Sequence, residues 1–220
     1  MGISRRNLFG KLTPTLFRAI ESATALAKLR GNPHVELVHW LLQLSQAPDS
    51  DFVRILTQAG LESARLHPQL TAALGQLPAG ASSLSDFSAH VEHAIERAWL
   101  LASLSHREGR VRSAWLLEAL LTTPALCQQT LAIAPLLQAL TTPQALASLG
   151  EWAAHSAEAN EPAHDGSGLA QALPGEASAA LAAPSEAEDS LTRFCDDLTA
   201  RARAGGIDPV IGRDGEIRAM

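Results

Sequence analysis

Two stretches of the chain carry apolar residues at the same intervals, which indicates an internal repeat. The first set is Leu12, Leu16, Ala19, Ile20, Ala23 and Ala27, and the second is Phe87, Val91, Ala94, Ile95, Ala98 and Ala102. Both sets are spaced by 4, 3, 1, 3 and 4 residues, which is typical of one face of an amphipathic helix. Residue identities agree as well, since "AIESA" at 19–23 matches "AIERA" at 94–98. The sequence therefore predicts the same helix twice.

A second apolar segment follows each of these helices after a polar turn. The segments are "VELVHWLLQL" at 35–44 and "VRSAWLLEAL" at 111–120, in which His39 matches Trp115. Ahead of the helices, Thr13-Pro14 and Ser88 are residues suited to cap a helix N-terminus.

One copy alone would leave its apolar stripe exposed to water, so we expect the two copies to pack together. The predicted fold is all-α: a pseudo-twofold tandem repeat of a roughly four-helix unit. Repeat one is expected at 12–75 and repeat two at 87–150, within a domain that spans 1–155.

The stretch "ISRRNLFGKL" precedes the first repeat and has no counterpart before Phe87. Leu8, Phe9 and Leu12 would share one face of an extra short N-terminal helix. Such a helix could simply cover part of the core. Alternatively, it could form one wall of a groove in which a partner helix lays its apolar face.

Composition and charge exclude several functional classes. The formal net charge is −6, and Lys occurs only at Lys11 and Lys28, so we expect no nucleic-acid partner. Arg5-Arg6 resembles a twin-arginine export signal, but charged residues and Pro14 interrupt the apolar stretch that such a signal needs. No run is long enough to span a membrane, and two distant cysteines form no disulfide framework. We therefore expect a cytoplasmic protein with no membrane partner.

The sequence changes character after Trp152. Residues 156–184 are rich in Ala, Glu, Pro, Gly and Ser without a sustained period, which predicts a flexible linker. "SEAE" at 185–188 is a capping box that starts a further helix, and Gly205-Gly206 ends it. "IDPVIGRDGEIR" follows at 207–218.

"DPVIGRDGEIR", preceded by "LTARARAGG", resembles the start of the first ATPase module of Hsp100/Clp unfoldases. The duplicated unit before it resembles the Clp N-domain. The resemblance implies that 185–220 is the truncated start of an AAA+ module. It also implies that Val210, Ile211 and Gly212 pack around the adenine of ATP in a full-length parent that uses ATP and Mg.

This chain itself is not expected to be an enzyme. Both lysines are followed by Leu, so no P-loop of the form G-x-x-x-x-G-K-[ST] is present. His90 and His93 are three residues apart on an expected helix, but the ligand set is incomplete, so we expect no metal site. No cofactor is expected for this chain.

"ISRRNLFGKL" together with "RGNPHVELVHWLLQL" resembles the ClpV (TssH) subfamily, the unfoldases of bacterial type VI secretion. The resemblance implies a hydrophobic groove that binds an N-terminal helix of the large sheath subunit, which is TssC/VipB-like. It also implies a homohexameric parent whose ring disassembles contracted sheath, whereas we expect this chain to be a monomer. Carried onto this sequence, the groove candidates are Leu8, Phe9, Leu12, Thr13, Leu16, Ile20, Phe87, Val91, Ile95 and Trp115. The alternative is a general Clp/Hsp100 N-domain that binds adaptors or unfolded substrates for disaggregation or proteolysis.

Overall fold

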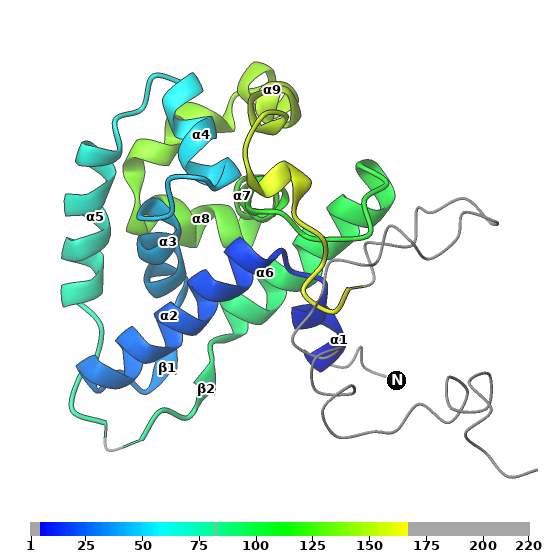
Figure 1. Cartoon of the computed structure of the whole chain (residues 1–220). Helices are drawn as coiled ribbons and strands as arrows, with labels where there is room; N and C mark the ends of the chain where they lie inside the picture. The colour runs from blue at the N-terminus through cyan, green and yellow to red at the C-terminus, as the bar shows by residue number, and fades with distance from the viewer. Residues whose placement is uncertain (1–4, 82, 167–220) are drawn as a thin grey trace, which may run out of the picture. The chain divides into compact units, whose positions relative to one another are not determined.

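Helices make up nearly all of the regular structure in the computed structural model, which describes residues 5–81 and 83–166 (Figure 1). The first half contains α1 (Arg5–Gly10), α2 (Pro14–Arg30), α3 (Leu37–Ser45), α4 (Asp51–Gln58) and α5 (Ser63–Gly75). The second half contains α6 (Ala89–Leu100), the π-helical turn η1 (Leu101–Ser105), α7 (Ser113–Thr122), α8 (Pro124–Ile133) and α9 (Pro143–Ala153). The second half also contains two 3-10 turns, η2 (Pro135–Thr141) and η3 (Glu158–Asn160). The all-α fold predicted from the sequence is confirmed.

Hydroxyl side chains start the repeat helices at the predicted positions. Thr13 Oγ1 accepts the N–H of Leu16, and Ser88 Oγ accepts the N–H of Val91, so α2 and α6 begin in the same way. These bonds satisfy amides that have no partner within the helix, and they therefore fix where each apolar stripe begins. At its other end, α2 stops at Gly31, whose φ of 66° lies in the left-handed region that favours glycine.

Two short parallel pairings join the repeats. The strand β1 (His34–Val35) pairs with β2 (Asp86–Phe87), which places Val35 beside Phe87, and a second bridge joins Leu12 to Val111. Leu12 and Phe87 are the first residues of the two apolar stripes. Each pairs with a residue that comes shortly after the stripe helix of the other repeat, Leu12 with Val111 after α6 and Phe87 with Val35 after α2. The two repeats are therefore interlocked, an arrangement that the spacing of apolar residues did not predict.

The matched stripes form the centre of the core. Every stripe residue of the first repeat is buried, and so is every stripe residue of the second except Phe87, which is half-buried. α2 packs against α3, and α6 packs against α7. Trp40 in α3 also donates its indole N–H to the carbonyl of Leu16 at 3.3 Å. Phe87 is thus the stripe residue that the fold leaves at the surface.

Residues 156–166 pack against the helical repeats, so the expected start of the linker at residue 156 is wrong. Ser156, Glu158 and Ala163 are buried, and His164 donates its backbone N–H to the carbonyl of Leu12 at 2.8 Å. In Figure 1 this segment, drawn in yellow, descends from α9 toward α1. The domain therefore includes residues 156–166.

The other expectations for the C-terminal part fall outside the described residues. They are the remainder of the linker to 184, the start of the ATPase module at 185–220, and its adenine-contacting residues Val210, Ile211 and Gly212. Within the described residues, no helix combines the length and the apolar character that crossing a membrane requires.

Candidate functional site

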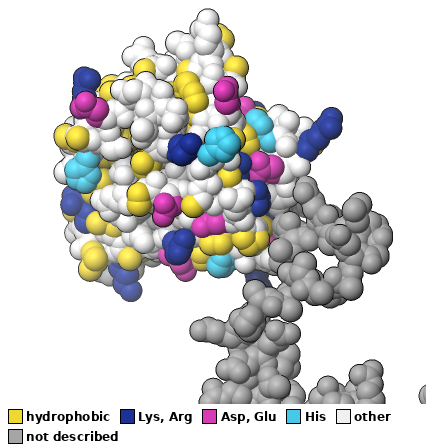
Figure 2. All heavy atoms as spheres, turned by 45° about the horizontal axis from the view of Figure 1, so that its top comes forward, with side chains coloured by type: hydrophobic (Ala, Val, Ile, Leu, Met, Phe, Trp, Pro, Cys, Tyr) yellow, Lys and Arg dark blue, Asp and Glu magenta, His cyan; other side chains and the backbone are white. Residues whose placement is uncertain are grey.

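A groove with a volume of about 710 Å³ opens beside the N-terminal helix. It takes its lining from α1, α2, β2 and the segment after α9. The lining residues are Arg5, Arg6, Phe9, Gly10, Phe17, Ile20, Glu21, Thr24, Phe87, His164 and Asp165. Figure 2 shows one face of the domain, where hydrophobic side chains are interspersed with charged ones. The groove combines these two kinds of side chain, which is a common pattern in binding sites.

Aromatic rings form much of the groove's inner surface. The ring centroids of Phe9 and Phe87 lie 5.0 Å apart with the planes tilted by 36°. Phe17 stacks on the imidazole of His164, with centroids 3.7 Å apart and planes within 10°. Ile20, a buried residue of the first stripe, also lines the groove. A partner that covered these rings would remove apolar surface from water, which is the main favourable term in most protein association.

An ion-pair cluster fastens α1 to the second repeat. The Arg5 guanidinium donates two hydrogen bonds to the Asp86 carboxylate, at 2.7 and 2.8 Å, and it also pairs with Glu92 in α6. The hydrogen bond from Arg5 holds the pKa of the Asp86 carboxyl below its usual value. Both bonds to Asp86 come from Nη1 of Arg5, while its other terminal nitrogen pairs with Glu92, so Arg5 links the helix that carries Phe9 to two residues beside and within α6.

A smaller hollow of about 200 Å³ lies along another side of α1. Its lining residues are Arg5, Leu8, Phe9, Glu92, Ile95 and Glu96. Leu8 and Ile95 are almost fully buried, so this hollow exposes less apolar surface than the main groove does.

The sequence-predicted groove residues divide into three groups in the structure. Phe9, Ile20 and Phe87 line the main groove, and Leu8 and Ile95 line the smaller hollow. The other five are buried and line neither: Leu12, Thr13, Leu16, Val91 and Trp115. Trp115 stacks instead on His106 at a centroid distance of 3.5 Å. These five side chains are packed in the interior and cannot reach a partner without opening it.

Several lining residues were not singled out by the sequence analysis. Phe17, Glu21 and Thr24 stand at i, i+4 and i+7 on α2, a row directly beside the buried stripe. This spacing could have suggested a second, exposed row. Nothing in the local sequence signals His164 and Asp165, because they lie in a stretch whose composition resembles a linker.

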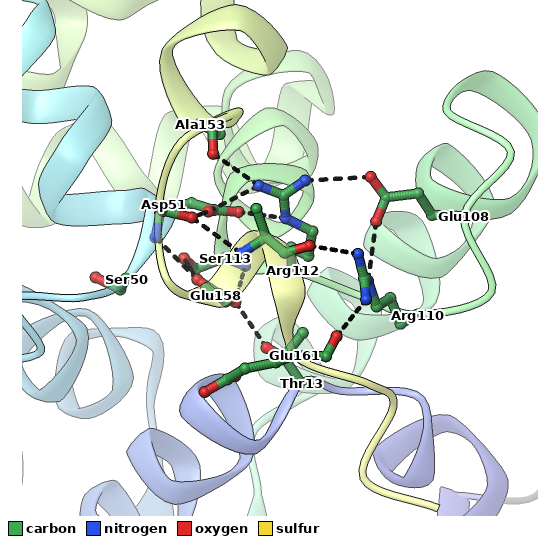
Figure 3. Close-up of polar contacts among 12 residues, drawn as sticks. Thr13, Ser50, Asp51, Glu108, Arg110, Arg112, Ser113, Ala153, Glu158 and Glu161 are labelled. Atoms are coloured by element: carbon green, nitrogen blue, oxygen red, sulfur yellow. Dashed lines mark hydrogen bonds and ion pairs between the residues drawn. The ribbon is translucent and has the colours of Figure 1, made fainter. Parts of the chain in front are cut away.

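Beside the groove, a buried polar cluster joins three helix N-termini (Figure 3). The fully buried Glu158 carboxylate accepts the hydroxyl of Thr13 at 2.6 Å and the backbone N–H groups of Ser113 and Asp51 at 2.7 and 2.9 Å. Asp51 in turn forms two hydrogen bonds with the Arg112 guanidinium, at 2.8 and 2.9 Å. Burial, together with the nearby Asp51 charge, raises the pKa of Glu158 to about 6. The groups of this cluster bond to one another and are closed to solvent. The cluster therefore has a structural role, in which it holds the three helix N-termini together.

The histidines that the sequence analysis considered have different surroundings. His39 is buried; its Nδ1 accepts the N–H of Glu36 at 3.0 Å, and its Nε2 lies 3.0 Å from Asn32 Oδ1. Burial lowers the pKa of His39, which favours the neutral ring. His90 and His93 are partly exposed on α6. Residues 5–81 and 83–166 contain no group of three potential metal-ligating side chains.

The fold and the groove define a class, a duplicated and interlocked all-helical domain with an aromatic groove beside its N-terminal helix. A family model for the Clp repeat (R) N-terminal domain matches residues 11–140. The chain therefore belongs to the Clp N-terminal domain family.

Two curated relatives match nearly the whole chain. The chaperone protein ClpB of Yersinia enterocolitica is 48% identical and covers 100% of the chain, and the AAA+ ATPase ClpV1 of Pseudomonas aeruginosa is 45% identical and covers 99%. The matches take in 25% and 24% of those proteins, so the chain spans about a quarter of their length.

Solved structures resemble the domain as well. One, from a study of the coevolution of the ATPase ClpV, the TssB-TssC sheath and the accessory HsiE protein, is 43% identical with a TM-score of 0.68. It matches 71% of this chain and 97% of its own. Another, a complex of a ClpV N-domain with a VipB peptide, is 26% identical with a TM-score of 0.61 and matches 72% and 96% of the two chains. The resemblance to ClpV N-domains that the sequence indicated is confirmed.

Proposed function

We propose that this domain is the substrate-recognition domain of a ClpV-type unfoldase, and that its groove binds an N-terminal helix of the large type VI sheath subunit. The observation that carries the proposal is the aromatic groove beside α1 in a domain similar to a ClpV N-domain that was solved with a VipB peptide.

The groove suits an amphipathic helix better than an extended peptide. Its inner surface is formed by rings from three separate elements, with Phe9 in α1, Phe17 in α2 and Phe87 in β2. Among the described residues, the strand that lines the groove is β2, and its two residues are too short an edge for an extended peptide to pair with. A helix needs only an apolar row at i, i+3, i+4 and i+7, whereas strand addition needs a free edge.

In the full-length parent, recognition would precede mechanical work. A helix captured by the groove is held at a high local concentration near the ATPase ring, and the ring would then pull the sheath subunit through its pore. A groove of this kind binds with affinities on the order of micromolar. Six domains on a homohexamer would compensate by avidity. ATP and Mg belong to the ring and not to this domain.

A second candidate is a general Clp N-domain that binds adaptors or unfolded segments for disaggregation or proteolysis. The observation in its favour is the 48% identity to a relative described as a ClpB chaperone. The two candidates differ in what they require of α1. A sheath-specific groove needs Arg5 and Phe9, whereas a general domain should bind without residues 1–11.

Fluorescence anisotropy of a labelled VipB N-terminal helix, titrated with the 220-residue chain, tests the proposal. We expect micromolar binding that a permanently unfolded, reduced and carboxymethylated protein does not displace. We also expect deletion of residues 1–11 to abolish binding while circular dichroism shows a folded domain. If the unfolded protein displaces the helix and the deletion spares binding, the general domain is the better description. The absence of binding by the unmodified chain would overturn the sheath assignment.

A further inference from the structure

The segment that follows α9 reaches the groove from the C-terminal side of the domain. His164 and Asp165 line the groove, although the rest of its lining comes from residues 5–24 and Phe87. We infer that residues 163–165 form a further wall of the groove, in addition to the surfaces supplied by α1 and by α2 with β2, and that this wall contacts the bound helix. We also infer that Glu158 is the positioning residue for this wall. Both inferences rest on the proposed function.

The wall is held along the end of α1 by backbone hydrogen bonds. The N–H of His164 donates to the carbonyl of Leu12 at 2.8 Å, and the N–H of Asp165 donates to the carbonyl of Gly10 at 2.9 Å. Ala163 is buried with 2% of its surface exposed, so the wall is seated and does not merely lie on the surface. Lys11 reaches the Asp165 carboxylate at 3.0 Å.

His164 presents a ring to the groove. One face of the imidazole stacks on Phe17, yet the residue as a whole remains exposed. A side chain that is fixed on one face and exposed elsewhere is suited to contact a partner, because little conformational freedom is lost when the partner binds. The wall therefore widens the aromatic surface formed by Phe9 and Phe87.

The wall is anchored upstream by buried and partly buried groups. Glu158 binds Thr13, the residue that caps α2, and so ties the segment to the helix that carries Phe17. Three residues later, Glu161 accepts the backbone N–H and the hydroxyl of Thr15 at 2.8 and 2.6 Å. Arg110 donates to the backbone carbonyls of residues 159 and 161. These contacts set the position of the wall before the chain reaches the groove.

Glu158 would influence binding in the groove indirectly, through the segment that carries His164. Its carboxylate does not line the groove, so it cannot contact a bound helix. Its replacement would act by releasing the segment that carries His164. If Glu158 had only a structural role, its replacement would lower the stability of the whole domain. The hydrogen exchange of the wall's amides would then not change relative to that of the amides in the repeat helices.

Substitutions in the 220-residue chain test the wall, with the labelled VipB N-terminal helix as the probe. We expect His164→Ala to raise the Kd on the order of five-fold, from the loss of an aromatic contact, and His164→Phe to restore binding. His155→Ala is the matched control, because His155 is also exposed but does not line the groove. We expect it to bind normally.

Amide hydrogen exchange in the absence of peptide supplies the second measurement. We expect the His164 and Asp165 amides to be protected in the unmodified chain and to lose protection in Glu158→Gln while α3 and α7 remain protected. This variant should also raise the Kd.

The outcomes separate the two proposals. If Phe87→Glu abolishes binding while His164→Ala leaves it unchanged, the wall is overturned and the sheath assignment stands. If the unmodified chain does not bind the peptide, the sheath assignment fails. The contact between the wall and a bound helix fails with it, and the exchange of the two amides then decides only whether Glu158 positions residues 163–165.

Discussion

The ring of Phe9 in α1 packs against the ring of Phe87 in β2, with centroids 5.0 Å apart. Phe87 opens the apolar stripe of the second repeat, and it is the stripe residue that is not buried. Phe9 belongs to the helix that has no counterpart in the second repeat. The contact therefore forms where the internal symmetry is broken, and it leaves two aromatic side chains at the edge of a groove.

Replacing Phe87 with Glu should abolish binding of the sheath helix. The change removes a ring contact and places a charge where a partner would exclude water, so we expect the Kd to rise more than ten-fold. Anisotropy titration measures the loss, and thermal denaturation checks that the domain remains folded. Leu104→Glu is the matched control, because Leu104 is 75% exposed and does not line the groove. Equal loss in both variants would mean that added negative charge, and not the groove, weakens binding.

Arg5 and Asp86 should act on binding as one unit. Because their ion pair holds α1 in place, we expect Arg5→Ala and Asp86→Ala each to raise the Kd a few-fold, and the double variant to raise it no further. Both side chains are about half exposed, so the melting temperature should hardly change. Additive effects in the double-mutant cycle would argue that each residue contacts the peptide separately. Lys28→Ala, an exposed cation outside the groove, is the control.

Periodicity in the sequence was sufficient to predict the repeated helices. The intervals from Leu12 and Phe87 identified the buried faces of α2 and α6, and Thr13 and Ser88 identified where these helices begin. An apolar interval, however, reports which face is buried and not what covers it. For this reason, Leu16 and other stripe residues that were proposed for the groove lie in the core.

Contacts between distant segments were not predictable in this way. Phe17 and His164 are far apart in the sequence, and the segment that carries His164 is tied to the start of α2 by the hydrogen bond from Thr13 to Glu158. A single buried carboxylate leaves no periodic signal in a stretch of small and polar residues, so residues 156–166 resembled a linker. The pairing of Val35 with Phe87 involves two-residue strands, which are too short to show alternation.

Removing the Glu158 side chain should destabilise the domain strongly. Glu158→Ala would leave the Thr13 hydroxyl and two buried backbone N–H groups without their acceptor. We expect a loss of roughly 3 kcal/mol or more in the free energy of unfolding. Urea denaturation followed by circular dichroism measures it. Glu151→Ala is the control, since Glu151 is exposed on α9, and it should change stability by less than about 0.5 kcal/mol. Similar stability of the two variants would contradict the role given to the cluster.

The same carboxylate should impose a pH dependence on stability. The pKa of Glu158 is raised from 4.5 to about 6 in the folded domain by burial and by the neighbouring Asp51 charge. Between these values the folded domain holds a proton that the unfolded chain has released, so raising the pH favours unfolding. The contribution of Glu158 is therefore fully present below about pH 4.5 and is lost as the pH rises through about 6. Its size is on the order of 2 kcal/mol.

Comparison with Glu158→Gln isolates this contribution, because other groups also titrate. Burial lowers the pKa of His39, so His39 makes the domain more stable as the pH rises, which is the opposite sign. Asp51 and Arg112 face Glu158 in both proteins, and subtraction removes their direct contributions. We expect the unfolding free energy of the unmodified chain minus that of the variant to fall between pH 4.5 and 7. A difference that is flat, or that rises with pH, would mean that the hydrogen bonds from Thr13 and Ser113 outweigh burial in setting the charge of Glu158.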